Sequence, residues 1–199
     1  SRAMIIAGFQ PLSLLDYPGI ISSIVFTQGC AFRCGYCHNP ELVPPNGKST
    51  LNPETVVDYL RSHKTMIEGV CVTGGEPTIH LDLPKFLATL KSLGLLVKLD
   101  TNGVHPRMIR GLVETHLVDF FAMDLKHTWT KYGVVIGKIA EHVTDPCRET
   151  FQLIQTAGIP HEFRTTIDAS MHSEEDIFEI AGMLLSGERY ALQSVRYGK

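Results

Sequence analysis

Short apolar runs rich in β-branched residues recur along the chain from about residue 20 to its end. Nearly every position in each run is apolar, which is typical of a β-strand that is buried on both faces. The stretches between the runs carry charged and polar positions every few residues and predict amphipathic helices. The pattern therefore predicts six strands, at residues 22–27, 69–73, 95–100, 118–124, 160–167 and 189–195.

Short polar motifs predict where several helices begin and end. Asn52 and Asp145 each stand before a proline, which predicts a helix N-cap followed by proline in the first turn. Ser173 has an aspartate three residues further on, which is the spacing of a capping box. Gly94 follows an apolar helical face and predicts a left-handed helix stop. These signals place helices between the predicted strands.

The repeated order of strand and helix determines the fold class. It predicts parallel strands joined by right-handed crossovers, and therefore an α/β protein. Six such strands can form either an open doubly wound sheet or an incomplete barrel. The connection after the first predicted strand and the one at residues 126–144 are longer than the others. Long connections in compact α/β domains are usually functional.

The length of 199 residues suits one domain. We expect this domain to span residues 4–199, because residues 1–3 precede Met4 and have the character of a cloning remnant. A hydrophobic content of 44% is typical of a globular protein, and a net charge of −3 argues against a general nucleic-acid binder. The sequence shows neither an apolar run of the roughly 18–20 residues that a membrane span needs nor a secretory leader pattern. We expect a cytoplasmic protein.

Three of the five cysteines lie within eight residues, in the segment GCAFRCGYCHNP after the first predicted strand. This odd and clustered set argues against a disulfide framework and favours metal chemistry in a reducing compartment. Cys30, Cys34 and Cys37 suit either zinc or an iron–sulfur cluster. A structural zinc site normally has four protein ligands, whereas three cysteines on a 4Fe–4S cluster leave one iron open to a substrate. The spacing therefore favours a reactive cluster.

Two other interpretations of the cysteines stay open at this point. His38 could complete a zinc knuckle with the three cysteines, although adjacent Cys37 and His38 would be strained around one tetrahedral ion. An electron-transfer cluster would need a fourth cysteine, and both Cys71 and Cys147 lie far from the segment in the sequence.

Polar motifs stand at the ends of the predicted strands. Gly74-Gly75-Glu76 follows the second strand, Asp100 ends the third, and Asp124 ends the fourth. Ligand sites in parallel barrels gather at the carboxyl ends of the strands, because the loops there share one face. Paired glycines let a ligand approach the backbone, and a neighbouring carboxylate can hold an amino group. An ordinary turn is the plainer interpretation of each motif taken alone.

The spacing C-x3-C-x2-C, with Tyr36 just before the last cysteine, resembles the radical S-adenosylmethionine (SAM) superfamily. The longer segments QGCAFRCGYCHNPEL and LLDYPG resemble the activating enzymes of glycyl radical enzymes. They are most similar to the activating proteins of anaerobic ribonucleoside-triphosphate reductase, and next to the pyruvate formate-lyase activases. The resemblance covers nearly the whole chain. It implies an incomplete parallel (β/α)6 barrel of the radical SAM type that binds a 4Fe–4S cluster and SAM.

The resemblance also implies roles for individual residues. Cys30, Cys34 and Cys37 would bind three irons of the cluster and so carry the catalysis. Around them, Tyr36 would meet the adenine mainly through its backbone, and Asn39 would be a further contact near the cluster. The backbone at Gly74 and Gly75, with the Glu76 carboxylate, would hold the methionine amino group of SAM.

A second group of residues is assigned by the resemblance to the other end of the cofactor. Asp100 and Asp124 would help to bind a monovalent cation, with turn capping as the alternative, and Lys126 would contact the methionine carboxylate. Arg164 would be a cofactor contact or a structural ion-pair residue, because a charge in an otherwise buried strand needs a partner. His172 would reach the cofactor from the loop after the fifth strand, with an exposed helix-start position as the alternative.

The activity implied by the resemblance is reductive cleavage of SAM, followed by formation of a glycyl radical on a partner enzyme under anaerobic conditions. Anaerobic ribonucleoside-triphosphate reductase is the favoured partner, and a pyruvate formate-lyase-like partner is the second choice. Flavodoxin or ferredoxin would supply the electron, and neither nucleic acid nor a membrane would take part. Two alternatives are a radical SAM enzyme for a small molecule, such as a 7-carboxy-7-deazaguanine synthase, and a non-enzymatic zinc-binding interaction module.

Overall fold

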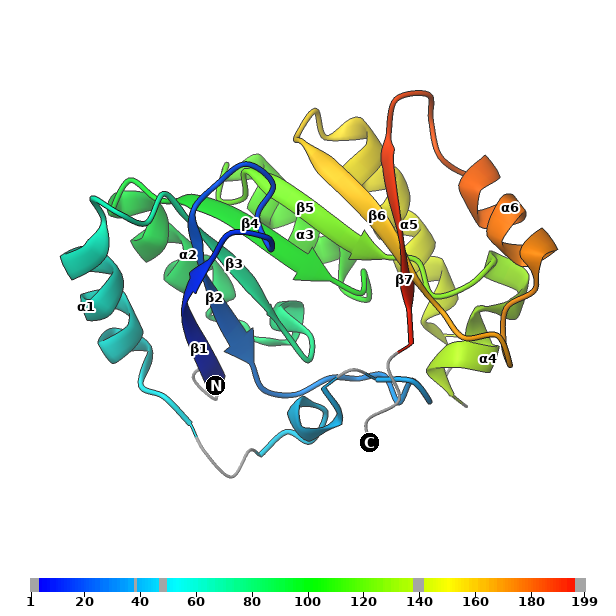
Figure 1. The fold of residues 1–199 in the computed structure, drawn as a ribbon, viewed down its shortest axis with the longest axis horizontal. Helices are drawn as coiled ribbons and strands as arrows, with labels where there is room; N and C mark the ends of the chain where they lie inside the picture. Colours follow the sequence, from blue (N-terminus) through cyan, green and yellow to red (C-terminus); the bar gives the residue numbers. More distant parts are fainter. Residues whose placement is uncertain (1–3, 38, 47–49, 138–141, 196–199) are drawn as a thin grey trace.

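A seven-stranded sheet in the sequential order β1 to β7 forms the centre of the computed structural model (Figure 1). The structure describes residues 4–37, 39–46, 50–137 and 142–195. The expected cloning remnant at residues 1–3 and the possible zinc ligand His38 therefore lie outside the described residues. The strands are β1 (Ile6–Ser13), β2 (Ser22–Thr27), β3 (Gly69–Gly74), β4 (Leu96–Thr101), β5 (Phe120–Asp124), β6 (His161–Ile167) and β7 (Arg189–Ser194).

The strand order decides between the two candidate architectures. Strands β2 to β7 pair in parallel with their sequence neighbours, and β1 pairs antiparallel with β2. A doubly wound sheet reverses its strand order at a switch point, whereas a strictly sequential order with right-handed crossovers keeps the helices on one face. Figure 1 shows the helices along the outside of the curved sheet. The prediction of an incomplete parallel barrel is therefore confirmed.

The six predicted strands match β2 to β7 within about two residues at each end, as expected for element boundaries. The sequence pattern did not predict β1, which contains Gly8 and Pro11 and lacks a continuous apolar run. Proline is tolerated in a strand that lies at the edge of a sheet. β7 differs from its prediction in burial, because Arg189 and Leu192 are exposed and the strand forms the other edge of the sheet.

Six α-helices and three short 3₁₀ helices connect the strands within the described residues. They are α1 (Pro53–His63), α2 (Leu83–Ser92), α3 (Pro106–Glu114), α4 (Tyr132–Ile136), α5 (Thr144–Thr156), α6 (Glu174–Gly182), η1 (Pro40–Leu42), η2 (Pro77–Ile79) and η3 (Trp129–Lys131). None of the helices that the structure describes is long and apolar enough to cross a membrane.

The helix caps follow the sequence signals in two of three cases. Asn52 caps α1 by accepting a hydrogen bond from the Glu54 N–H at 2.9 Å, and Ser173 forms the predicted capping box of α6. The prediction that Asp145 caps α5 is wrong, because the helix begins at Thr144 and Val143 holds the N-cap position. The first four N–H groups of a helix have no partner within it, so Pro146 is accommodated at the third helical position instead of the first.

The apolar core lies between the outer face of the sheet and the helices. Leu60 of α1, Leu90 of α2, Leu112 of α3 and Ile154 of α5 are all fully buried. Burying each such side chain contributes about 1.5–3 kcal/mol relative to leaving it exposed. By contrast, the inner face of the barrel carries charged side chains, which include the buried Lys98 and, two positions further along the same face of β4, Asp100. This division places the chemistry of the chain inside the barrel.

Candidate active site

A cavity of about 280 Å³ lies inside the barrel at the carboxyl ends of the strands. Its lining combines the cysteine segment after β2, the glycine pair after β3 and charged side chains of β4 to β6. It brings together Cys30, Cys34, Tyr36, Cys37, Asn39, Gly74, Gly75, Glu76, Asp100, Asp124, Lys126 and Arg164, which are all of the predicted site residues except His172.

The cysteine loop, residues 28–37, is held in place mainly by backbone hydrogen bonds at its start. The Gly29 N–H donates to the Leu42 carbonyl at 2.7 Å, and the Cys30 N–H donates to the Val43 carbonyl at 3.1 Å. The Gln28 side chain donates to the carbonyls of Glu41 and Pro44. These contacts fold residues 40–44 back against the start of the loop. The three cysteines are thereby directed toward the inside of the barrel.

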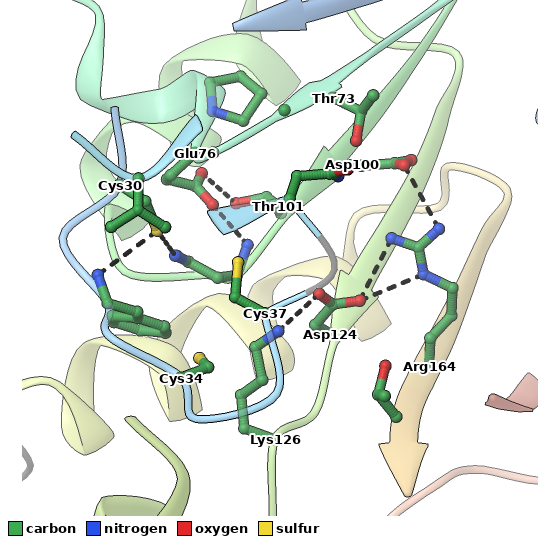
Figure 2. Close-up of a pocket in the computed structure, with 18 of the residues that line it drawn as sticks. Cys30, Cys34, Cys37, Thr73, Glu76, Asp100, Thr101, Asp124, Lys126 and Arg164 are labelled. Atoms are coloured by element: carbon green, nitrogen blue, oxygen red, sulfur yellow. Dashed lines mark hydrogen bonds and ion pairs between the residues drawn. The ribbon is translucent and has the colours of Figure 1, made fainter. Parts of the chain in front are cut away.

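The three thiols line one volume, between Glu76 and Lys126 in Figure 2. Within the described residues, however, no three His, Cys, Asp or Glu side chains converge closely enough to hold a single metal ion. In a 4Fe–4S cluster each cysteine binds a different iron, so its ligands stand around a volume rather than around a point. The cavity therefore offers three cysteine ligands, the number that a 4Fe–4S cluster with one open iron would need.

The local environment of the thiols combines hydrogen bonds to sulfur with burial. The Phe32 N–H donates to Cys30 Sγ at 3.4 Å and the Asn102 side chain donates to it at 3.7 Å. Burial raises the pKa of the Cys30 thiol to about 11. Burial also raises the pKa of Cys34, although the nearby Lys126 ammonium opposes the rise. Both cysteines are therefore protonated at neutral pH until a metal displaces the proton.

The glycine pair after β3 permits a close contact with the cysteine loop. Gly74 has a φ of +126°, which favours glycine, and a Cβ atom there would lie 2.3 Å from the Thr27 nitrogen. At Gly75 a Cβ atom would lie 2.2 Å from the Gly29 carbonyl oxygen. No side chain fits at either position without moving the backbone. The end of β3 and the cysteine loop therefore form one unit.

Glu76 ties the ends of β3 and β4 together from a buried position. Its Oε1 accepts hydrogen bonds from Thr101 Oγ1 at 2.7 Å and from both the N–H and the hydroxyl of Thr78. Its Oε2 accepts the Asn102 N–H at 2.7 Å. Burial raises the pKa of Glu76, and these donors oppose the rise. A carboxylate oxygen has two lone pairs, so Oε2 retains capacity for a ligand amino group.

Five charged side chains form what we call the charge chain: Lys98, Asp100, Arg164, Asp124 and Lys126. Lys98 Nζ lies 2.6 Å from Asp100 Oδ1, and Arg164 Nη1 lies 3.3 Å from Asp100 Oδ2. Arg164 Nη2 lies 3.2 Å from Asp124 Oδ1, and Lys126 Nζ lies 2.8 Å from Asp124 Oδ2. Figure 2 shows the Arg164 guanidinium between the two aspartates.

The ion pairs keep the members of the charge chain ionised in spite of burial. Burial favours the neutral form of Asp124, but Lys126 and Arg164 hold its pKa at about 2. The pKa of Asp100 is lowered in the same way by Arg164 and Lys98, against the effect of burial. The pKa values of Lys126 and Arg164 are raised, because their aspartate neighbours outweigh burial. Three cations against two anions leave one surplus positive charge.

His172 is buried behind Lys126 and does not line the cavity. Its Nδ1 accepts the Asp168 N–H at 3.1 Å, so its Nε2 donates to the Lys126 carbonyl at 2.8 Å. The ring stacks on His127 with 4.6 Å between centroids. Its expected contact with the cofactor stays a prediction, and in the structure His172 positions the backbone of Lys126.

Sequence reasoning did not select Lys98, Thr101 and Asn102 as site residues. Lys98 gave a usable signal, because it is a charged residue in an apolar run and stands two positions before Asp100, on the same face of the strand. Thr101 and Asn102 gave no such signal, because their positions suit an ordinary turn. Their roles follow from contacts with Glu76 and Cys30, which belong to other segments.

Sequence comparison identifies a matching family and related proteins. The profile of the Radical SAM superfamily matches residues 24–184. A Methanocaldococcus jannaschii protein named as a glycyl-radical enzyme activating enzyme is 31% identical over 194 residues, which cover 95% of this chain and 79% of the relative. The pyruvate formate-lyase-activating enzyme of Staphylococcus aureus strain USA300 is 30% identical over 167 residues. These cover 76% of this chain and 65% of that enzyme, slightly less than two thirds of its length.

Solved structures share the fold at low sequence identity. Streptococcus suis SuiB bound to S-adenosylmethionine superposes with a TM-score of 0.68 and 16% identity, over 86% of this chain and 40% of SuiB. Escherichia coli QueE superposes with a TM-score of 0.52 and 13% identity, over 96% of this chain and 93% of QueE. Both likenesses concern the barrel, and neither defines a substrate.

Proposed function

The chain belongs to the radical SAM superfamily, and from this premise we propose that it is an activating enzyme that generates a glycyl radical on a partner protein. Superfamily membership implies an enzyme with a 4Fe–4S cluster and SAM. The observation that carries the proposal is that the three cysteines of the C-x3-C-x2-C motif line one cavity together with the glycine pair, Glu76 and Lys126. The similarity to an activating enzyme along 95% of the chain supports the choice of reaction.

The cysteine residues would hold the cluster, and the rest of the cavity would orient SAM. Cys30, Cys34 and Cys37 would bind three irons, which leaves one iron of the cluster without a protein ligand. A bound cluster would supply the electron that cleaves SAM to methionine and a deoxyadenosyl radical, which removes a hydrogen atom from glycine. This chemistry belongs to the cofactors, and the protein contributes binding, orientation and exclusion of water.

The two polar groups of the methionine moiety have matching partners in the cavity. The Glu76 Oε2 atom and the backbone at Gly75 would receive the amino group. The Lys126 ammonium would receive the carboxylate, with its backbone held by His172. Tyr36 adds a buried hydroxyl to which the structure gives no hydrogen-bond partner within the described residues. A buried polar group without a partner is costly, so this hydroxyl suits a ligand that completes the site.

We further propose anaerobic ribonucleoside-triphosphate reductase as the partner and flavodoxin or ferredoxin as the reductant, in the cytoplasm. The partner assignment rests on the similarity of the segments around Cys30 and at residues 14–19 to that branch of activating proteins. A monovalent cation near Asp100 and Asp124 belongs to the same set of proposals.

The test is anaerobic reconstitution followed by three measurements. The wild-type protein should bind about four irons per chain, release 5′-deoxyadenosine from SAM with a reductant, and produce a glycyl radical signal in electron paramagnetic resonance when mixed with the reductase. Cys34→Ala should lose all three properties. Cys71→Ala and Cys147→Ala are matched controls that should keep them, because both cysteines lie outside the cysteine loop.

The outcomes separate the alternatives. Loss of the cluster in Cys71→Ala or Cys147→Ala would point to a fourth cysteine ligand and an electron-transfer protein. One zinc per chain without iron or sulfide would identify a zinc module. Cleavage of SAM without a glycyl radical on any candidate partner would favour a small-molecule substrate. A fully reconstituted protein that cleaves no SAM overturns the enzyme assignment.

A further inference from the structure

Asn102 lies between the cysteine loop and the carboxylate of Glu76. It directly follows β4, is only 5% exposed and lines the cavity. Its side-chain Nδ2 donates to Cys30 Sγ at 3.7 Å, and its backbone N–H donates to Glu76 Oε2 at 2.7 Å. Figure 2 shows two dashed lines that meet at the Cys30 sulfur, and these are the hydrogen bonds from Asn102 and from the Phe32 N–H.

The orientation of the Asn102 amide is fixed by its other hydrogen bonds. Its Oδ1 accepts the Val104 N–H at 3.0 Å, so the oxygen and the nitrogen of the amide cannot be exchanged without losing this bond. Nδ2 is therefore the atom that faces Cys30. The backbone carbonyl of Asn102 accepts a hydrogen bond from Cys147 Sγ at 3.3 Å. Because the residue is held at its N–H, its carbonyl and its side-chain oxygen, the amide is preorganised as a donor to sulfur.

This hydrogen bond becomes stronger when the Cys30 sulfur binds iron. A neutral thiol is a weak acceptor, whereas an iron-bound cysteine sulfur carries negative charge, and hydrogen bonds to charged groups are roughly twice as strong as those between neutral groups. Reduction adds one further negative charge to a cluster. A buried N–H donor therefore stabilises the reduced form more than the oxidised form, which raises the reduction potential. Of the three loop cysteines, Cys30 is the one whose sulfur accepts a side-chain N–H within the described residues.

We propose that Asn102 raises the reduction potential of the 4Fe–4S cluster by donating its side-chain N–H to the sulfur of Cys30. It is a positioning residue that acts through Cys30. Its effect is a larger reduced fraction of the protein at a given potential of the electron donor. This inference rests on the proposed binding of a cluster and is independent of SAM and of the identity of the partner protein.

The test is a redox titration of the reconstituted protein without SAM, in which electron paramagnetic resonance measures the reduced fraction against the applied potential. Asn102→Leu keeps the approximate shape of the side chain and removes the donor. The one-electron reduction equilibrium should become at least about threefold less favourable, which lowers the potential by about 28 mV or more. A smaller change, or a rise of the potential, overturns the proposal.

A second variant separates the donor to sulfur from the structural role of the side chain. In Asn102→Ser the hydroxyl can still accept the Val104 N–H, but it is too short to reach Cys30 Sγ. The melting temperature of the cluster-free protein should therefore fall less than in Asn102→Leu, whereas the reduction equilibrium should again be at least about threefold less favourable. A wild-type potential in Asn102→Ser would overturn the proposal. This variant also decides the question if Asn102→Leu assembles no cluster.

Asn52→Leu is a matched control outside the cavity. Asn52 Oδ1 accepts the N–H of the second residue after it, Glu54, at 2.9 Å, just as Asn102 Oδ1 accepts that of Val104. The control should lower the melting temperature and leave the reduction potential unchanged. An equal shift of the potential in Asn52→Leu would contradict a role for the contact with Cys30. A wild-type protein that binds no cluster overturns the proposed function, whereas a cluster whose potential does not respond to Asn102 overturns this inference alone.

Discussion

The two ends of the cavity are built in different ways. At one end, Cys30, Cys34 and Cys37 lie on a loop, and the hydrogen bonds to the Cys30 sulfur are two long N–H···S bonds. At the other end, the charge chain lies on β4, on β6 and at the end of β5, and its carboxylates are fully paired. The protein alone completes the charged end, whereas the cysteine end depends on a bound metal. Folding and cofactor assembly are therefore separable in this molecule, and substitutions can test that separation.

The largest effect is expected at the cysteine end. Cys37→Ala should abolish cluster binding and SAM cleavage, because a metal site that loses a ligand loses most of its affinity. The unfolding free energy of the protein without a cluster should change by less than about 1 kcal/mol, because Cys37 is not part of the packed core. Iron analysis and urea denaturation of the apo-protein check both parts. A large loss of apo-protein stability would show that the cysteine loop contributes to folding.

The opposite pattern is expected in the middle of the charge chain. Arg164→Met leaves both aspartates with one cation each and should lower the unfolding free energy of the apo-protein by about 3–5 kcal/mol. Urea denaturation measures this loss. The folded fraction should still bind about four irons per chain after reconstitution. An unchanged denaturation midpoint would mean that the charge chain does not stabilise the fold.

A smaller effect should appear in the pH dependence of stability. Asp124 has a folded-state pKa of about 2 against a model-peptide value of 3.8. Its ion pairs therefore stabilise the fold fully above pH 3.8, and this contribution is lost as the pH falls through 2. Between about pH 4 and pH 2 the wild type should lose about 1–2 kcal/mol more than Asp124→Asn. Urea denaturation at several pH values gives this difference, and parallel curves for the two proteins would contradict the assignment.

The smallest effect is expected outside the cavity. Ser173→Ala removes the hydrogen bond from the Asp176 N–H to Ser173 Oγ and should lower the unfolding free energy by about 1 kcal/mol. Iron content and SAM affinity should not change. The variant calibrates the other stability measurements, because it affects only a helix terminus. A changed SAM affinity would instead connect α6 to the Lys126 backbone through neighbouring His172.

The sequence predicts the parallel strands and the edge at which the site forms more reliably than it predicts the contacts within the site. Strands β2 to β5 are buried at most positions because both of their faces are covered, and the apolar runs within them indicate this without a structure. β1 lacks the pattern because it lies at an edge. A pair within one strand, such as Lys98 and Asp100, follows from residue spacing.

Contacts between strands depend on the register in which the strands pair, and this register cannot be read from the sequence. Arg164 reaches both Asp100 and Asp124 only because β6 stands next to β5 in a register that pairs Asp124 with Arg164. Glu76 likewise finds its donors on a segment that follows β4. For His172 the number of residues in the preceding loop decides whether the ring enters the cavity or packs behind Lys126.

The contact between Gly29 and Gly75 has a consequence for comparing related chains. Because a single methyl group at residue 75 would overlap the Gly29 carbonyl, the spacing between the sulfur ligands and the neighbouring strand is set by bare main chain. A homologue with alanine at this place must route its ligand-bearing segment along a different path. Glycine at residue 75 is therefore a sequence marker for the close approach of the two main-chain segments. Related chains that keep it are expected to keep the same distance between the cysteine loop and β3.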